Sequence, residues 1–438
     1  MRKFCVVLLA VVGGALFAPT ANTTANAEAV YRRFDGSTSD KWKTATNWSG
    51  DNVPNATDEC ADFDGDNNGV DKLRFQKWFH VDTTIGQLRI KSPVTVRGFN
   101  GMWNGNLKSV FTLSPSAYFE GIGLDMSAAT VDFTLDSGSG VPRNLVLKLG
   151  ESQQWNVTST SASGNLVLGT SARPYNDVEL QSYALTANVG TGRLIDSTYA
   201  TFRGAGGSVI KTGDGELRLG MANTYTGDTT IHGGTLKLTG SGTIDSSPTI
   251  VVGDAGSSGA VLQKSSGTFN VGSTQTLKGI GTVIGDVSVA AGGTLAPGAS
   301  GVGTLTFGNS LTLNDNALLV FELAGTGASD LVTLTGSNQL TIGSGLLEWD
   351  DFVFADLGAT AGTYTLFDTG APIVGTLGTS LTGTVGSLEG TLSLANADND
   401  LVLTLASSAG PVIPEPSAFL IWALGLLGLP VYAWRRKR

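Results

Sequence analysis

Short segments in which apolar and polar residues alternate recur along most of the chain, and Gly, Asn, Asp or Ser bounds nearly every one of them. Alternation with a period of two predicts strands with one buried face, and the bounding residues favour turns. No stretch between Glu28 and Gly410 sustains a helical apolar period over three turns. The pattern therefore predicts an almost all-β fold, with strands at 208–211, 216–219, 235–239, 249–252, 282–284, 286–289 and 304–307 among others.

A repeated hexapeptide indicates how these strands are arranged. Ile231 to Leu236 (IHGGTL) is echoed by Ala290 to Leu295 (AAGGTL), at an offset of 292 − 233 = 59 positions. That offset is close to three turns of about 20 residues, the repeat size of a stacked solenoid. We predict a right-handed parallel β-helix as the core, with a β-sandwich as the alternative, because sandwiches also place short strands at regular intervals. The side chains expected to point inward include Leu217, Leu219, Leu236 and Leu238.

The N-terminus has the pattern of an export signal. Arg2 and Lys3 precede an apolar run from Phe4 to Phe17, and Ala25 and Ala27 supply the small-x-small pattern that a signal peptidase requires. The mature chain is therefore expected to begin at Glu28. A transmembrane helix is the alternative, although Gly13, Gly14 and Pro19 shorten the run.

The C-terminus combines three elements. Pro414, Glu415 and Pro416 break regular structure, and an uncharged apolar run follows at 418–434. As a helix this run spans roughly 25 Å, which is short but sufficient for a bilayer core of about 30 Å. Cations then close the chain, and they are expected to stay on the cytoplasmic side: Arg435, Arg436, Lys437 and Arg438.

The order of these three elements resembles the PEP-CTERM sorting signal of exported Gram-negative proteins. That resemblance implies recognition by an exosortase-type processing enzyme, followed by transfer to the cell surface or extracellular matrix. An ordinary anchor helix is the alternative reading of the apolar run alone.

A second resemblance lies in the middle of the chain. The segment from Lys211 to Leu219 (KTGDGELRL), followed by ANTYTGDTTI at 222–231 and by Gly-Gly-Thr-Leu at 233–236, resembles the autotransporter-associated β-strand repeat of bacterial passenger domains. Residues 279–308 are similar to the coils that follow such repeats, and 42–63 is similar to an N-terminal module of these proteins. The chain departs from true autotransporters because too few residues follow Gly345 for their membrane β-barrel.

The composition of the chain limits the classes of partner and of site that it can have. The formal net charge is −10, and without residues 1–27 and 435–438, which hold six cations and no acids, it becomes 21 − 37 = −16. Such a surface repels nucleic acid and anionic lipid. Cys60 is the one cysteine outside the predicted signal peptide, and it is expected to be a buried apolar residue. Because His80 and His232 are the only histidines, a histidine zinc site or catalytic triad is not expected.

Two groups of residues offer possible binding chemistry. Asp64, Asp66 and Asn68, with Gly69 after them, match the start of an EF-hand-like calcium loop, but position twelve is Phe75 and not the bidentate Glu. A solvated turn is therefore preferred to a metal site, and no cofactor is predicted. The Trp residues of the early chain could stack on sugars, but core or capping roles are preferred: Trp42, Trp48, Trp78 and Trp103.

These observations give a domain plan and two functional hypotheses. The plan is a signal peptide at 1–27, a capping module at 28–75, a solenoid at 76–345 with the passenger-like repeat near 208–240, a β cap at 346–405, a linker at 406–413 and the sorting signal at 414–438. The first hypothesis is a non-catalytic surface or matrix protein, anchored transiently in the inner membrane, with a polysaccharide-binding adhesin as a subclass. The second is a β-helix polysaccharide lyase or hydrolase, for which a stacked carboxylate cluster would be needed.

Overall fold

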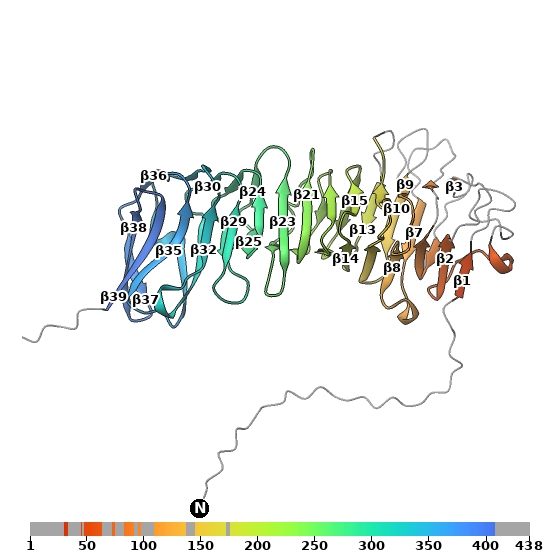
Figure 1. The fold of residues 1–438 in the computed structure, drawn as a ribbon, viewed down its shortest axis with the longest axis horizontal. Coiled ribbons are helices and arrows are strands. Elements are labelled where there is room, and N and C mark those ends of the chain that lie inside the picture. Colours follow the sequence, from red (N-terminus) through yellow and green to blue (C-terminus); the bar gives the residue numbers. More distant parts are fainter. Residues whose placement is uncertain are drawn as a thin grey trace, which may run out of the picture.

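The computed structural model describes residues 30–33, 45, 48–63, 72–74, 83–91, 95–97, 109–136, 145–171 and 176–407. These residues form an elongated rod of short strands stacked along one axis, running from β1 at one end to the β37–β39 region at the other (Figure 1). Apart from four single-turn 3-10 helices, the described secondary structure is all strand, so the prediction of an all-β fold is confirmed. The 3-10 helices are η2 (Ser49–Asp51), η3 (Ala117–Phe119), η4 (Gly325–Gly327) and η5 (Trp349–Asp351).

Two long sheets run the length of the rod. Sheet I contains 13 strands, all parallel to their neighbours. Its strands, in spatial order, are β1 (Val30–Arg33), β2 (Glu59–Phe63), β5 (Gln87–Ile90), β8 (Ile122–Asp125), β11 (Gln153–Val157), β14 (Ala184–Val189), β17 (Ser208–Thr212), β20 (Thr229–Ile231), β22 (Thr249–Val252), β25 (Thr276–Gly279), β28 (Thr294–Pro297), β31 (Leu318–Ala324) and β34 (Phe352–Leu357).

Sheet II contains 15 strands and is parallel until its last members. Its strands are β3 (Lys72–Arg74), β6 (Thr95–Arg97), β9 (Phe133–Asp136), β12 (Leu166–Leu168), β15 (Leu194–Ser197), β18 (Glu216–Leu219), β21 (Gly233–Leu238), β23 (Ser258–Lys264), β26 (Thr282–Ile284), β29 (Thr304–Phe307), β32 (Leu331–Leu334), β35 (Gly362–Thr369), β39 (Asp400–Ser407), β38 (Leu388–Ala395) and β37 (Thr382–Val385).

Two shorter parallel sheets supply the third side of the coils. Sheet III has six strands, β4 (Thr83–Ile85), β7 (Ser109–Leu113), β10 (Leu145–Leu149), β13 (Asn176–Glu179), β16 (Ala200–Gly204) and β19 (Thr224–Tyr225). Sheet IV has five, β24 (Phe269–Val271), β27 (Val287–Val289), β30 (Leu311–Leu313), β33 (Leu340–Leu347) and β36 (Val374–Leu377). Successive strands visit different sheets and then return beside the earlier strand, which is the connectivity of a parallel β-helix.

One core runs through the stack. Within sheet II, Leu217 lies in register with Leu236, and Leu236 with Leu262, so that equivalent leucines stack from coil to coil. All four leucines predicted to point inward, including Leu219 and Leu238, are fully buried. The predicted strands lie within two residues of observed ones, and those at 216–219, 249–252, 282–284 and 304–307 coincide with β18, β22, β26 and β29.

The predicted coil length needs a correction. The two Gly-Gly-Thr-Leu copies do not stack on each other, because Thr235 lies on β21 of sheet II and Thr294 lies on β28 of sheet I. Their offset along the sequence is therefore not a whole number of coils. Coils differ in length because their turns differ: in sheet II the step from Leu236 to Leu262 is longer than the step from Leu217 to Leu236.

The second glycine of the first copy is explained by backbone geometry. Gly234 has φ of 61°, in the left-handed region, and a Cβ at this position would lie 2.4 Å from the carbonyl oxygen of Gly215 in the coil before it. Any side chain would therefore separate the two coils. Glycine is therefore needed at position 234, because the backbones of two coils approach closely there.

The C-terminal end of the core is covered by an antiparallel meander. Strand β39 pairs with β35 and β38, and β38 pairs with β37, all antiparallel. Trp349 lies beneath this meander, within van der Waals contact distance of Gly383 and Gly390. The meander contributes buried Leu392, Leu401 and Leu403 to the core, and it therefore caps the stack.

The predicted signal helix and the predicted C-terminal helix lie outside the described residues. No helix in the described part of the chain is long and apolar enough to cross a bilayer. The right hand of the coil stays a prediction, supported by the general preference of parallel crossovers.

Candidate functional site

Most of the residues predicted to carry chemistry lie outside the part of the chain that the structure describes. These are the candidate calcium ligands Asp64, Asp66 and Asn68, the cleavage residues Ala25 and Ala27, and the sorting residues Pro414, Glu415, Pro416, Arg435, Arg436, Lys437 and Arg438. Trp42, Trp78 and Trp103 also lie outside it. The described ranges contain no group of three or more His, Cys, Asp or Glu side chains placed to hold a metal ion.

The predicted residues that the structure describes lie in surroundings that indicate structural roles. Trp48 is buried and packs edge-on against Phe63, with 5.8 Å between the ring centroids, so it is a core residue. Cys60 is a free, buried thiol, and its burial raises its pKa to about 12. A thiol of that kind is a poor nucleophile. His232 pairs with Asp254 at 2.9 Å on the surface.

Lys211 is a buried, charged residue in the coil whose sequence resembles the passenger-domain repeat. Lys211 ends the inward-facing positions of β17, and its side chain is fully buried. The ammonium group donates to three backbone carbonyl oxygens, those of Thr212 at 2.8 Å, Gly213 at 2.6 Å and Gly233 at 3.1 Å. Desolvation lowers the Lys211 pKa to about 8, while the nearby Asp214 opposes the shift. All three N–H donors are used, so Lys211 ties the turn after β17 to the next coil.

A chain of buried hydroxyl groups crosses the same coils. The Tyr225 hydroxyl lies 2.6 Å from Thr229 Oγ1, which donates to Ser247 Oγ at 2.9 Å, and Ser247 donates to the carbonyl oxygen of Gly227. Burial raises the Tyr225 pKa. Asn223 donates to the carbonyl oxygens of Met221 and Thr243, both at 2.9 Å, and so satisfies backbone groups where the strand ends. These contacts hold coil to coil, and the side chains that make them face the interior.

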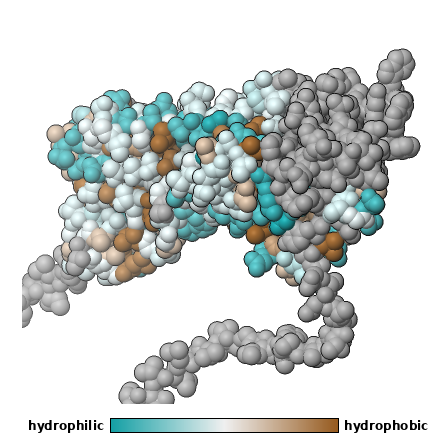
Figure 2. All heavy atoms as spheres, turned by 45° about the vertical axis from the view of Figure 1, so that its right-hand side comes forward, coloured by the Kyte–Doolittle hydropathy of each residue, from teal (hydrophilic) through white to brown (hydrophobic). Residues whose placement is uncertain are grey.

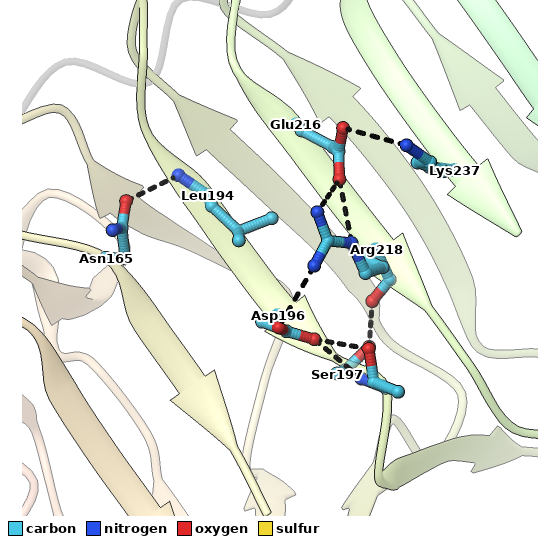
Figure 3. A network of polar contacts seen from close by, with 8 residues as sticks. Asn165, Leu194, Asp196, Ser197, Glu216, Arg218 and Lys237 are labelled. Carbon is cyan, nitrogen blue, oxygen red and sulfur yellow. Dashed lines mark hydrogen bonds and ion pairs between the residues drawn. The ribbon is translucent and has the colours of Figure 1, made fainter. Parts of the chain in front are cut away.

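The outer face of sheet II carries a row of paired charges (Figure 3). Arg218 on β18 lies 2.6 Å from Glu216 on the same strand and 3.3 Å from Asp196 on β15. Lys237 on β21 reaches the other oxygen of Glu216 at 3.9 Å. Two acids and two bases therefore neutralise one another across three adjacent strands. Each side chain is about one quarter exposed, so such a network adds modestly to stability and is weakened by salt.

The same arrangement recurs in earlier coils. Arg89 donates through Nε to Asp62 at 2.8 Å on sheet I. On sheet III, Arg203 Nη2 lies 3.2 Å from Asp177 and 3.3 Å from Glu179. These three carboxylates are bound to guanidinium groups. A general acid or base would instead need a carboxylate with access to a bound sugar.

Sequence reasoning missed the buried charged residues, of which Lys211 and Asp330 are the most enclosed. Lys211 could have been found, because in the alternation Val209, Ile210, Lys211 it occupies the inward phase. Asp330 had no such signal, since it precedes β32 in a turn. Its oxygens accept from the backbone N–H of Gly303 at 2.8 Å and of Glu322 at 2.7 Å, and burial raises its pKa to about 6.

Comparison with known families finds a match in this region. The model of the passenger-associated-transport-repeat family matches residues 209–238, which run from β17 to the end of β21 and include Lys211. The match supports the passenger-like repeat predicted near 208–240. A search of curated proteins finds no match to the chain.

Proposed function

We propose that this chain is a non-catalytic structural protein of the cell surface or extracellular matrix, an acidic β-solenoid that is exported and then sorted through its C-terminal segment. The observation that carries the proposal is the passenger-associated repeat, set within a continuous stack in which sheet I alone joins 13 strands. Repeats of this kind suggest an exported surface protein. A rod of stacked coils provides length and a repeating surface, which suit a stalk or matrix component.

The route to the surface uses both ends of the chain. Signal peptidase cleaves after Ala27, and the apolar segment 418–434 then holds the protein in the inner membrane with its terminal cations in the cytoplasm. An exosortase-type enzyme recognises Pro414, Glu415 and Pro416 and releases the solenoid outward. This step rests on the order of the three C-terminal elements.

The non-catalytic part of the proposal rests on the pairing of outward acidic side chains with basic ones. Two outward acids in and beside the passenger-associated repeat, Asp196 and Glu216, are held by Arg218 and Lys237. A lyase or hydrolase on this scaffold remains the alternative, and it would need carboxylates on adjacent coils that converge on a bound sugar.

A polysaccharide-binding adhesin is a second form of the same proposal, favoured by one feature of sheet IV. Its outward positions Asn270, Ser288, Thr312 and Thr341 lie in register on successive strands. Because adjacent strands are about 4.8 Å apart, this column presents hydrogen-bonding groups at that spacing along the rod. An extended glycan lying along the axis could bind such a column.

Two measurements on the exported protein test the proposal. Protease treatment of intact cells should cleave the solenoid if it is displayed at the surface, and a cytoplasmic protein in the same cells should stay intact. The purified protein should not degrade pectin, alginate or other uronate polymers. Turnover that a single Asp→Ala substitution abolishes would establish the enzyme reading instead, and protection from protease in intact cells would contradict surface display.

A further inference from the structure

The outer face of sheet I changes character in its last two strands. Along β31 the outward side chains are Leu318, Val320, Glu322 and Ala324, because Leu319, Phe321 and Leu323 are buried. The parallel register places Val353, Ala355 and Leu357 of β34 beside them on the same face. Val353 is 47% exposed and Leu357 is 52% exposed. We call these seven outward residues the β31/β34 face.

Apolar side chains on the outside of a solenoid require an explanation. Of the seven large apolar residues that are exposed in the described chain, Val353 and Leu357 lie on this face, and Leu346 and Val374 lie on sheet IV of the same end of the rod. Figure 2 shows apolar residues at several places on a surface of mostly intermediate hydropathy, some of them toward the C-terminal end of the rod. Contiguous apolar patches on a protein surface mark interaction sites, whereas single exposed apolar residues are normal.

A carboxylate for which the described residues supply no counter-ion lies within this apolar face. Glu322 is in register with Ala355 and is flanked on its own strand by Val320 and Ala324. Its Oε2 atom is enclosed and has no hydrogen-bond partner among the residues that the structure describes. An enclosed, unpaired carboxylate oxygen is costly, and a cation placed against it would recover that cost. In the earlier coils the outward acids Asp62, Asp177 and Asp196 each have an arginine.

The C-terminal region of the solenoid that contains the β31/β34 face carries acidic residues and no basic ones. Residues 279–407, all of which the structure describes, contain 12 Asp and Glu and no Lys, Arg or His. The last cation before them is Lys278 on β25, and it lies in register with Ala296 of β28. No side chain of this region can therefore supply the missing counter-ion. The field around the β31/β34 face attracts cations and repels anionic lipid and a second copy of the same end.

We propose that the β31/β34 face is the docking surface for a polypeptide partner that presents an arginine or lysine between apolar side chains. The cation pairs with Glu322, and the flanking apolar side chains cover Val320, Val353 and Leu357. This inference stands independently of the proposed sorting route, because it concerns the folded solenoid alone.

Fluorescence anisotropy with two labelled probes tests the proposal. One probe is an octapeptide in which leucine and arginine alternate, and the other is an octapeptide of arginine alone. The full-length exported protein should bind the alternating probe more tightly. Glu322→Gln should weaken that binding about tenfold, as expected when one partner of an enclosed charge pair is removed. The double variant V353T/L357T should weaken the alternating probe and leave the oligoarginine probe unchanged.

A matched control separates the face from the general field. Glu389→Gln removes the same charge from an exposed position on β38, outside the β31/β34 face, and should leave binding of the alternating probe unchanged. Thermal unfolding by circular dichroism checks that every variant is folded. Equal weakening by Glu389→Gln and Glu322→Gln, or equal affinity for both probes, would reduce the effect to non-specific charge and overturn the proposal.

Two further results would assign the face to another occupant and overturn the proposal as well. The first is self-association of the wild-type protein in sedimentation velocity that V353T/L357T abolishes, which would identify a second copy. The second is binding to vesicles of phosphatidylcholine that the same variant abolishes, which would identify a lipid surface.

Discussion

Replacing Leu236 by alanine tests the stacked core at its centre. Leu236 is fully buried on β21, in register with Leu217 on one side and Leu262 on the other. Removing its side chain deletes buried methyl groups and leaves a cavity between two coils, which costs about 2 to 5 kcal/mol. Leu236→Asp should cost more, because it buries a charge between Leu217 and Leu262 in the apolar stack.

The loss should also be local. In a solenoid each coil contacts only its neighbours, so stability is a sum of coil and interface terms. Urea unfolding followed by tryptophan fluorescence measures the total loss. Hydrogen exchange measured by mass spectrometry should show lost protection in β18, β21 and β23, while the distant strand β11 keeps its protection.

The neighbouring residue provides the control. Thr235 lies on the same strand with its side chain on the outer face, so Thr235→Ala should change stability by no more than about 0.5 kcal/mol. If Leu236→Ala cost no more than Thr235→Ala, the inward orientation of Leu236 would be wrong. Loss of protection along the whole rod would contradict the nearest-neighbour argument.

Three other substitutions test the polar contacts. The pKa of Lys211 is lowered to about 8 in the folded state. Between about pH 8 and about pH 10.5 only the unfolded state keeps the proton, so the wild type should gain stability relative to Lys211→Met as the pH rises through that range. Urea unfolding midpoints measured across the range test this. The pKa of Asp330 is raised to about 6, so the wild type should gain stability relative to Asp330→Asn as the pH falls from about 6 to about 4; the same titration in acid measures it, and a parallel pH profile for the two proteins would refute it. Arg218→Met should cost under about 1 kcal/mol, and a high-salt buffer should shrink the difference, because the Arg218 pairs with Asp196 and Glu216 are partly exposed; a cost that salt leaves unchanged would assign the effect to packing.

Much of the solenoid could be predicted because the signals that define it are local. Alternation located β18 and β22 to the residue, and it identified the inward leucines 217, 219, 236 and 238. Coil length could not be predicted, because turns between strands vary without a periodic signal. Both copies of the Gly-Gly-Thr-Leu motif lie at the start of a strand, and these strands belong to different sheets, β21 to sheet II and β28 to sheet I.

The contacts of individual side chains between coils were harder to predict. Lys211 obeys the alternation, but a buried lysine is rare enough that its three carbonyl partners had to be seen in the structure. The β31/β34 face depends on the register between two strands that are distant in the sequence, where Val320 lies beside Val353. Alternation shows that Val320, Glu322 and Ala324 share one face, but it does not show which strand lies beside them.

The sorting proposal is tested most directly by mass spectrometry of the C-terminus of the native protein, combined with fractionation of the same cells. In a host with the exosortase, the wild-type protein should leave the inner membrane and lack residues 418–438. Changing Pro414, Glu415 and Pro416 to alanine should leave the protein in the inner membrane with its C-terminal mass intact. Equal fractionation and equal C-terminal mass for the two proteins would show that the segment is a simple membrane anchor, and would contradict the proposed route to the surface.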